Sequence, residues 1–308
     1  MSEKSQNEIH LIDGWQEIAG DWTKKNGKIT HEANVISTDP DKLYINDRMA
    51  SDGYLKTKIR ILNETDGEKQ GQLIFRYKST QQYYFAGVGG YHKKFCIGKR
   101  VPDAWFGLAL YGPEEEVKLD TSFDMKVSFI GTKIELYIGG VRLLEVNDNS
   151  SPFLNGNVGL RTFKQNKVVF EEVNLWQDKP RCFVIMPFAE KYRSLYETFI
   201  KILLTALGLE AKRADEIFGT NPIIQDILEN IQKSRLIIAF VTESNPNVLY
   251  EIGVAHTLKK DVIILTPDIN KLPFDIRHLR CIQYDDSLAG SEKLRSDLEL
   301  TVKQILST

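Results

Sequence analysis

The stretch LIIAFVTESNPNVLYEIGVAH, Leu236 to His256, joins a continuous apolar run to the start of an amphipathic helix. A short run of consecutive apolar residues is typical of a strand that is buried on both faces, as in a parallel sheet. Asn245 is a good N-cap and Pro246 a good first helical residue, so the helix is expected to begin there. A buried strand that leads directly into a helix is the repeating unit of α/β folds.

The same order of elements repeats through the second half of the chain. Helices are expected over residues 192–207, 222–233, 246–259 and 288–306, and strands over CFVIMPF, LEAKRA, LIIAFVT, DVIILTP and CIQY. We therefore predict an α/β domain over residues 178–308, with a flavodoxin-like parallel sheet covered by helices on both faces. In such sheets the ligand crevice lies beyond the carboxyl ends of the strands.

Glu251 interrupts the apolar face of the helix that begins at Pro246. At 3.6 residues per turn, Val248, Ile252 and Ala255 form one stripe, and Glu251 lies on the same side. Burying an ionised carboxylate without a partner costs on the order of several kcal/mol, so such a residue has either a partner or a chemical purpose. The structural alternative is that Glu251 pairs with Arg213 or with a backbone donor and merely completes the fold.

Before Trp176 the dominant period is two. Apolar and alternating segments lie between Gly, Asn and Asp turn clusters, and no convincing amphipathic helix separates them; the segments are LKTKIRIL, GQLIFRYK, YYFAGVGG, WFGLALYG, MKVSFIG and KIELYIGG. This pattern predicts an all-β antiparallel jelly-roll sandwich over residues 1–177. The lysine-rich and arginine-rich segment at residues 93–100 is interpreted as a solvated loop. The two halves are therefore expected to be unrelated domains joined by the short linker QDKPR.

Three sequence features of the first half together resemble those of a known group of β-sandwich proteins. Trp22 follows a GDW turn, FIGTKIELYIGG is a hairpin, and GNVGLRTF precedes a closing strand. This half resembles the concanavalin A-like, laminin-G-like jelly rolls. We expect it to be a sensor or oligomerisation module with a carbohydrate or a protein as its ligand. Tyr91 and Trp105 are among the aromatic residues that could stack against a sugar, although core packing is their more common role in strands.

Composition and cysteine usage exclude several classes of protein. The formal net charge of −2 gives no strong signal for nucleic-acid binding, and no apolar run has the length of a signal peptide or a membrane span. We therefore expect a cytoplasmic protein without a membrane partner. Cys96, Cys182 and Cys281 show no CxxC spacing, and the five histidines form no ligand pair, so we expect reduced thiols and no metal site.

Five segments of the second half together resemble a known family. CFVIMPF, RADEI, LIIAFVT, NPNVLYEIGVAH and PFDIRH occur in an order and spacing similar to those of the nucleoside 2-deoxyribosyltransferase-like proteins, which neighbour the TIR domains. In that family the glutamate of a [YF]-E-x-G segment acts at C1′ of a ribosyl or deoxyribosyl group, and Glu251 matches it. A carboxylate suits this task because breaking an N-glycosidic bond builds positive charge on the anomeric carbon.

The resemblance implies an N-glycosidase that cleaves a nucleoside, a nucleotide or NAD⁺, with Glu251 as the catalytic residue and no cofactor beyond the substrate itself. It further implies a homo-oligomer that depletes a nucleotide in antiviral defence. Further residues near the predicted strand ends are candidates for binding substrate: Met186 and Phe188 as walls for the base, Arg213 and Asn247 for a phosphate, Asp215 and Asp226 for sugar hydroxyls or for orienting Glu251, and Thr242 at the end of the third strand.

One position departs from the family pattern. Family members often carry an acidic residue in the third strand, where this chain has Phe240. The absence of this acid makes base exchange doubtful, and it leaves hydrolysis or binding without turnover as the more open functions. The alternative function is therefore a module that binds a nucleotide signal without cleaving it.

Overall fold

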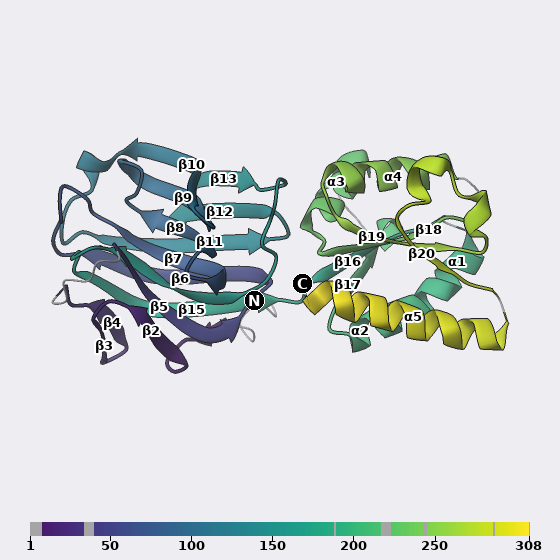
Figure 1. The fold of residues 1–308 in the computed structure, drawn as a ribbon, viewed down its shortest axis with the longest axis horizontal. Helices are drawn as coiled ribbons and strands as arrows, with labels where there is room; N and C mark the ends of the chain where they lie inside the picture. Colours follow the sequence, from purple (N-terminus) through teal and green to yellow (C-terminus); the bar gives the residue numbers. More distant parts are fainter. Residues whose placement is uncertain are drawn as a thin grey trace. The chain divides into compact units, whose positions relative to one another are not determined.

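The computed structural model describes residues 8–33, 40–187, 189–216, 223–242, 245–285 and 287–307, without the side chains of Asp215, Ile223, Leu288 and Ser307. The chain forms two compact units, of which the first ends at Asp178 and the second begins at Lys179. In Figure 1 the first unit consists almost entirely of strands, whereas strands and helices alternate in the second unit. The prediction of a β-sandwich followed by an α/β domain is confirmed at this level.

Two antiparallel sheets form the first unit. One sheet has the order β13-β12-β11-β6-β15-β4-β3, with β1 also paired to β15; its strands are β13 (Val141–Asn147), β12 (Lys133–Ile138), β11 (Ser122–Ile130), β6 (Asp52–Ile61), β15 (Val168–Asp178), β4 (Lys28–His31), β3 (Trp22–Lys25) and β1 (Glu8–His10).

The other sheet has the order β10-β9-β8-β7-β14-β5-β2. Its strands are β10 (Ala104–Pro113), β9 (Lys93–Val101), β8 (Gln82–Val88), β7 (Gly71–Ser79), β14 (Asn157–Phe163), β5 (Asp41–Met49) and β2 (Trp15–Ala19). A short 3-10 turn, η2 (Glu114–Glu116), follows β10. The interior between the sheets is a single apolar cluster that includes Phe75, Phe129 and Phe170, as expected for face-to-face sheets.

Strand β9 corrects the interpretation of residues 93–100 as a solvated loop. The segment pairs with β8 and β10, and its Lys99 is buried, with Nζ 2.7 Å from a carboxylate oxygen of Asp148. The lysines and arginines at the two ends of the strand hide its alternation, because a buried charge that has a partner is not visible in a hydropathy pattern.

A parallel five-stranded sheet forms the second unit, in the order β17-β16-β18-β19-β20. Its strands are β16 (Arg181–Ile185), β17 (Glu210–Arg213), β18 (Leu236–Phe240), β19 (Asp261–Thr266) and β20 (Arg280–Gln283). Counted within the unit this order is 2-1-3-4-5, the order of flavodoxin-like sheets. Every residue of β18 is buried, as the apolar run in the sequence predicts.

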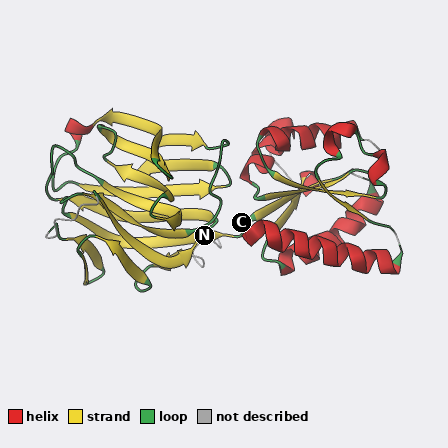
Figure 2. Ribbon diagram, viewed as in Figure 1, coloured by secondary structure: helices red, strands yellow, loops and turns green. Residues whose placement is uncertain are grey.

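Helices cover both faces of this sheet, as Figures 1 and 2 show. On one face lie α1 (Glu190–Leu195), a π turn η3 (Tyr196–Ile200), α2 (Lys201–Ala206) and α5 (Leu288–Ser307). On the other face lie α3 (Ile223–Lys233) and α4 (Pro246–Thr257). Three short 3-10 turns complete the unit, namely η4 (Ala214–Glu216), η5 (Ile269–Lys271) and η6 (Phe274–Ile276).

The chain changes faces between β16 and β18. The helices after β16 lie on the face opposite to the helix after β18, so the connections diverge where these two strands end. In an open parallel sheet this point of divergence is where ligands bind. Among the described residues, no helix combines the length and apolar character needed to cross a membrane.

Arg76 provides a test of what holds the first unit together. Its guanidinium is fully buried and donates to the carbonyl oxygens of Ser51, Gly131 and Phe153 and to the Asp52 carboxylate, at 2.8 to 3.1 Å. We expect Arg76→Ala to lower the free energy of unfolding by about 3–5 kcal/mol, because it leaves a buried carboxylate without this cation.

Urea unfolding followed by tryptophan fluorescence measures this change in the first unit alone, because all four tryptophans lie between residues 15 and 176. The control is Arg142→Ala, which removes exposed ion pairs to Glu135 and Glu145 and should change the midpoint little. Equal losses in the two variants would contradict the assignment of stability to the buried Arg76.

Candidate functional site

The start of α4 is fixed by local chemistry. The Asn245 side chain accepts a hydrogen bond from the backbone N–H of Asn247 at 3.0 Å, and Pro246 is the first helical residue, as the sequence predicts. Because α4 follows the parallel strand β18, its N-terminus lies at the carboxyl edge of the sheet. Asn247 itself is exposed in the first turn.

Glu251 lies in the second turn of α4, beside the buried face made by Val248, Ile252 and Ala255. Its side chain is half-buried, and within the described part of the chain no hydrogen bond or ion pair reaches its carboxyl group. Burial raises the pKa of Glu251 to about 7, because the charged form loses hydration. The structural alternative of an ion pair with Arg213 is therefore not what the described residues show.

This carboxyl group suits proton transfer and charge stabilisation. A pKa near neutrality lets one group exchange a proton at physiological pH. Its ionised form, taken partly out of water, interacts strongly with a cation that develops beside it.

A hollow of about 540 Å³ opens at the same carboxyl edge of the sheet. It is lined from α1 and η3 and from the ends of β18, β19 and β20; the lining residues are Lys191, Tyr192, Ser194, Leu195, Thr198, Thr242, Pro267, Tyr284 and Asp285. The Tyr192 hydroxyl and the Thr242 Oγ1 lie 2.8 Å apart in a hydrogen bond. This bond joins the helix after β16 to the end of β18, which is the point where the chain changes faces.

The helix beside the hollow contains the π turn η3, which begins at Tyr196. Such wide turns inside α-helices are frequent at functional sites. Tyr196 is fully buried and donates its hydroxyl to Glu216 at 2.7 Å, and Lys201 donates to the same carboxylate at 2.7 Å. Burial pushes the pKa of Glu216 up, but the hydrogen bonds from Lys201 and Tyr196 outweigh it and leave the pKa lowered.

Arg213 and Met186 lie beneath the edge rather than on it. Arg213 is 1% exposed, its guanidinium stands 5.4 Å from the Tyr196 ring centre, and its Nη1 lies 3.6 Å from the sulfur of Met186. Met186 is 4% exposed and belongs to the apolar core on the α5 face. Both side chains are thus buried and packed against each other, and neither lines the hollow.

The remaining predicted binding residues are spread over the edge. Thr242 is the one among them that lines the hollow within the described residues, whereas Asp226 is partly buried on α3. The prediction for Phe188 falls outside the described residues, as does the side chain of Asp215.

Sequence reasoning missed Tyr192, Tyr284 and Asp285. Tyr284 and Asp285 follow β20 directly, so the rule that ligands lie beyond the carboxyl ends of parallel strands was sufficient to find them. No sequence rule pointed to Tyr192, because it lies at the start of a predicted helix rather than directly after a strand.

Phe240 occupies the position where the family resemblance expects an acid. It has no exposed surface, and its ring centre lies 6.2 Å from that of Tyr284. A buried apolar side chain here supports the wall of the hollow and supplies no proton.

One group of side chains in the first unit has donor atoms close enough to hold a cation, although the sequence predicts no metal. The ligand atoms of Glu68, His92 and Glu114 lie within 4.8 Å of one another. Glu68 and Glu114 already accept hydrogen bonds from the Gln70 side chain at 2.7 Å and from the Lys69 N–H at 2.9 Å. The His92 side chain is 87% exposed, which is typical of a surface ion-pair cluster.

No known family model matches the chain, and no curated protein matches it by sequence. Solved structures resemble parts of it. A carbohydrate-binding module from Bacillus subtilis is 21% identical over 52% of this chain and 94% of its own, with a TM-score of 0.45. A putative glycosyl hydrolase from Parabacteroides distasonis is 14% identical over 58% of this chain and 98% of its own, with a TM-score of 0.41.

A third similar structure is a CMP N-glycosidase from Clostridium botulinum. It is 20% identical over 39% of this chain and 98% of its own, with a TM-score of 0.32. Similarity at this level carries no conclusion about activity or ligand, so the function has to be inferred from the residues of the site.

The raised pKa of Glu251 has a consequence for stability. The folded protein binds the Glu251 proton more tightly than the unfolded chain does. Protonation of Glu251 therefore favours the folded state fully below pH 4.5, and this stabilisation is lost as the pH rises through about 7. We expect Glu251→Gln, which carries no charge at any pH, to be more stable than the natural protein at pH 8 by about 1 kcal/mol, a value reduced for the exposed part of the side chain.

Thermal unfolding followed by the helical circular dichroism signal measures this difference, since every described α-helix lies in the second unit. The two proteins should have matching stability at pH 4.5. A Glu251→Gln variant that is less stable than the natural protein at pH 8 would show that the carboxylate is paired rather than desolvated.

Proposed function

We propose that the second unit is an N-glycosidase that cleaves the C1′–N bond of a nucleoside, a nucleotide or NAD⁺, with Glu251 at C1′. The observation that carries the proposal is a half-buried carboxyl group, without a described partner, at the carboxyl edge of a flavodoxin-like sheet. Functional sites are where such energetically costly placements concentrate. The ordered segments around NPNVLYEIGVAH support the same chemistry by their resemblance to nucleoside 2-deoxyribosyltransferase-like proteins.

The reaction assigns a definite role to the ionised carboxylate. The C1′–N bond breaks, and its electron pair leaves with the base; nicotinamide leaves as a neutral molecule, whereas the base of a nucleoside or nucleotide takes up a proton from the solvent. The positive charge that develops at C1′ is stabilised by Glu251, or is trapped as a C1′–O bond to it. The oxygen of a water molecule then bonds to C1′, any bond to Glu251 breaks, and the proton of the water passes to Glu251 or to the solvent. The products are the free base and the sugar, which keeps any phosphate or ADP group that it carried in the substrate.

The hollow beside the strand ends is the proposed place for the rest of the substrate. Its volume of about 540 Å³ lies within the range of small-molecule sites. Tyr192 and Tyr284 offer aromatic surface for a base, and Thr242, Lys191 and Asp285 offer polar contacts for a sugar. Thr242 comes shortly before the Asn245 cap of α4 in the sequence, and Glu251 is not among the described residues that line the hollow.

The surroundings of the other predicted binding residues suit their predicted roles to different degrees. Burial of Arg213 and Met186 favours a supporting role beneath the edge over direct contact with substrate. Asn247, exposed in the first turn of α4, is placed where a phosphate would meet backbone N–H groups. Roles for Phe188, Asp215 and Asp226 stay predictions.

The wider biological role rests on the resemblance alone. We propose that the sandwich regulates the second unit, that assembly into a homo-oligomer starts the activity, and that depletion of a cytoplasmic nucleotide in antiviral defence is the outcome. Membership of the sandwich in the concanavalin A-like group is part of the same proposal.

The buried Phe240 favours a second function, in which the second unit binds a nucleotide signal without cleaving it. An acid at this position would take part in proton transfer, and phenylalanine cannot. Retained ligand binding without release of base distinguishes this function from the first.

Chromatography of incubations with NAD⁺, CMP and a nucleoside panel tests the enzyme directly. We expect the natural protein to release free base or nicotinamide, and Glu251→Gln to reduce the rate by roughly 10²- to 10⁴-fold, since the charge that stabilises C1′ is lost. Glu299→Gln on the exposed face of α5 is the matched control and should retain full activity. Crosslinked protein is included so that a resting state is not mistaken for an inactive one. Absence of release in every state, with ligand still bound, would establish the binding module instead.

The pH dependence gives a separate check. Because the ionised form of Glu251 is needed, kcat/KM should rise with pH and level off above a midpoint near 7. A midpoint near 4.5, the ordinary value for glutamate, would contradict the proposed environment.

A further inference from the structure

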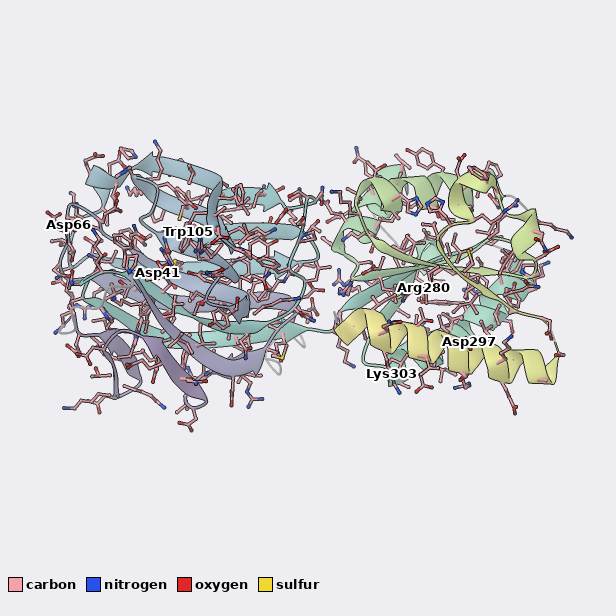
Figure 3. All side chains as sticks on the ribbon, viewed as in Figure 1. Asp41, Asp66, Trp105, Arg280, Asp297 and Lys303 are labelled. Atoms are coloured by element: carbon pink, nitrogen blue, oxygen red, sulfur yellow. The ribbon has the colours of Figure 1, made fainter. Side chains whose placement is uncertain are left out.

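A second hollow, of about 220 Å³, lies in the first unit over the sheet that contains β10, β8 and β14. Residues from six parts of the chain line it, and they combine buried charge with aromatic surface: Asp41, Gln70, Phe85, Tyr91, Trp105 and Arg161. Figure 3 labels Asp41 and Trp105, which lie close together on the sandwich.

Arg161 and Asp41 form the polar floor of this hollow. Both residues are buried, and Arg161 donates from Nε to Asp41 Oδ1 at 2.9 Å and from Nη2 to the same oxygen at 2.5 Å. Arg161 also donates to the amide oxygens of Gln70, at 3.1 Å, and of Gln72. The floor thus presents donors and acceptors together and has no net charge.

Aromatic rings form the walls. The Arg161 guanidinium lies 4.8 Å from the ring centre of Phe85 and 5.0 Å from that of Trp105, and the Trp105 and Phe85 rings meet edge to face at 5.5 Å. Trp105 is 37% exposed. A large aromatic ring left partly open beside a buried ion pair is unusual for a residue that serves only the core.

Tyr91 reaches the hollow through an uncommon turn. Gly89, Gly90, Tyr91 and His92 all have positive φ, at +74°, +107°, +56° and +54°. Two consecutive non-glycine residues in this region cost on the order of 1–3 kcal/mol each, and such strain is retained where the surrounding structure requires it. Ion-pair distances of 3.6 and 3.9 Å join His92 to Glu68 and Glu114 at the far end of the turn.

The hydroxyl of Tyr91 has no hydrogen-bond partner among the described residues, although the atom is buried. A buried hydroxyl without a partner costs roughly 1–3 kcal/mol. The turn therefore places an unused donor and acceptor at the hollow, at an energetic cost that a bound polar group would offset.

We propose that this hollow binds one neutral sugar ring. The C–H face of a sugar packs against the exposed part of the Trp105 ring. Aromatic walls combined with a few convergent polar groups are typical of small-molecule sites. Its hydroxyls, each a donor and an acceptor, match the paired charges of Arg161 and Asp41 and the unused hydroxyl of Tyr91. The small volume limits the ligand to one ring, either a free monosaccharide or the terminal residue of a longer chain.

Saturation-transfer NMR and calorimetry on the full chain test this site with D-glucose, D-galactose, D-fructose and D-ribose, and with neutral disaccharides of the same sugars. The disaccharides distinguish a terminal residue from a free sugar. We expect millimolar or tighter binding of at least one probe, and a loss of at least about tenfold in affinity in Trp105→Ala.

Tyr91→Phe separates binding from folding. Because the hydroxyl has no partner among the residues that the structure describes, its removal should leave the unfolding midpoint unchanged or raised while weakening sugar binding several-fold. The matched controls are Phe106→Ala, next to Trp105 and 50% exposed, and Tyr111→Phe on the same strand. The proposal is overturned if no probe binds the natural protein, or if binding is unchanged in both Trp105→Ala and Tyr91→Phe.

Discussion

Both faces of the parallel sheet in the second unit are buried, and this constraint decides where chemistry can take place. Every residue of β18 is inaccessible, and the helices on the two faces seal separate apolar clusters. Polar groups are therefore restricted to the two edges of the sheet, and the carboxyl edge is where the connections diverge. The hollow lined by Tyr192 and Thr242 and the N-terminal half of the helix that carries Glu251 both lie at this edge. A second hollow of similar size lies at the opposite edge, where β19 and β20 begin.

Buried ions elsewhere in the chain show by contrast why Glu251 is distinctive. Arg76 is surrounded by carbonyl oxygens and a carboxylate, and Lys99 is paired with Asp148. These groups are compensated, which is the usual condition for charge in a protein interior. Within the described parts of the chain, Glu251 is desolvated without such compensation, and the buried hydroxyl of Tyr91 likewise has no hydrogen-bond partner. Groups of this kind cost stability in the free protein and gain from a ligand that offers them a partner.

The sequence was sufficient for the parts of the fold that depend on long periodic patterns. The helix expected over residues 246–259 is α4, Pro246–Thr257, because its cap and its apolar stripe agree. Patterns failed where tertiary partners decide the outcome. Strand β9 was missed because Lys99 looks solvated until its ion pair with Asp148 is known, and Arg213 looked available for phosphate although packing against Met186 and Tyr196 buries it. Positive φ at Tyr91 is set by the contacts around its turn, which no local propensity reports.

The central claim is that the Glu251 carboxyl group is desolvated and has no partner among the described residues. Carbon-detected NMR of the glutamate carboxyl groups, titrated from pH 4 to pH 9 and assigned with Glu251→Gln, measures its pKa directly. The claim predicts one resonance, absent from the variant, with a midpoint near 7. A midpoint for Glu251 at or below 4.5, the ordinary value for glutamate, would show a solvated or paired carboxylate and would contradict the account.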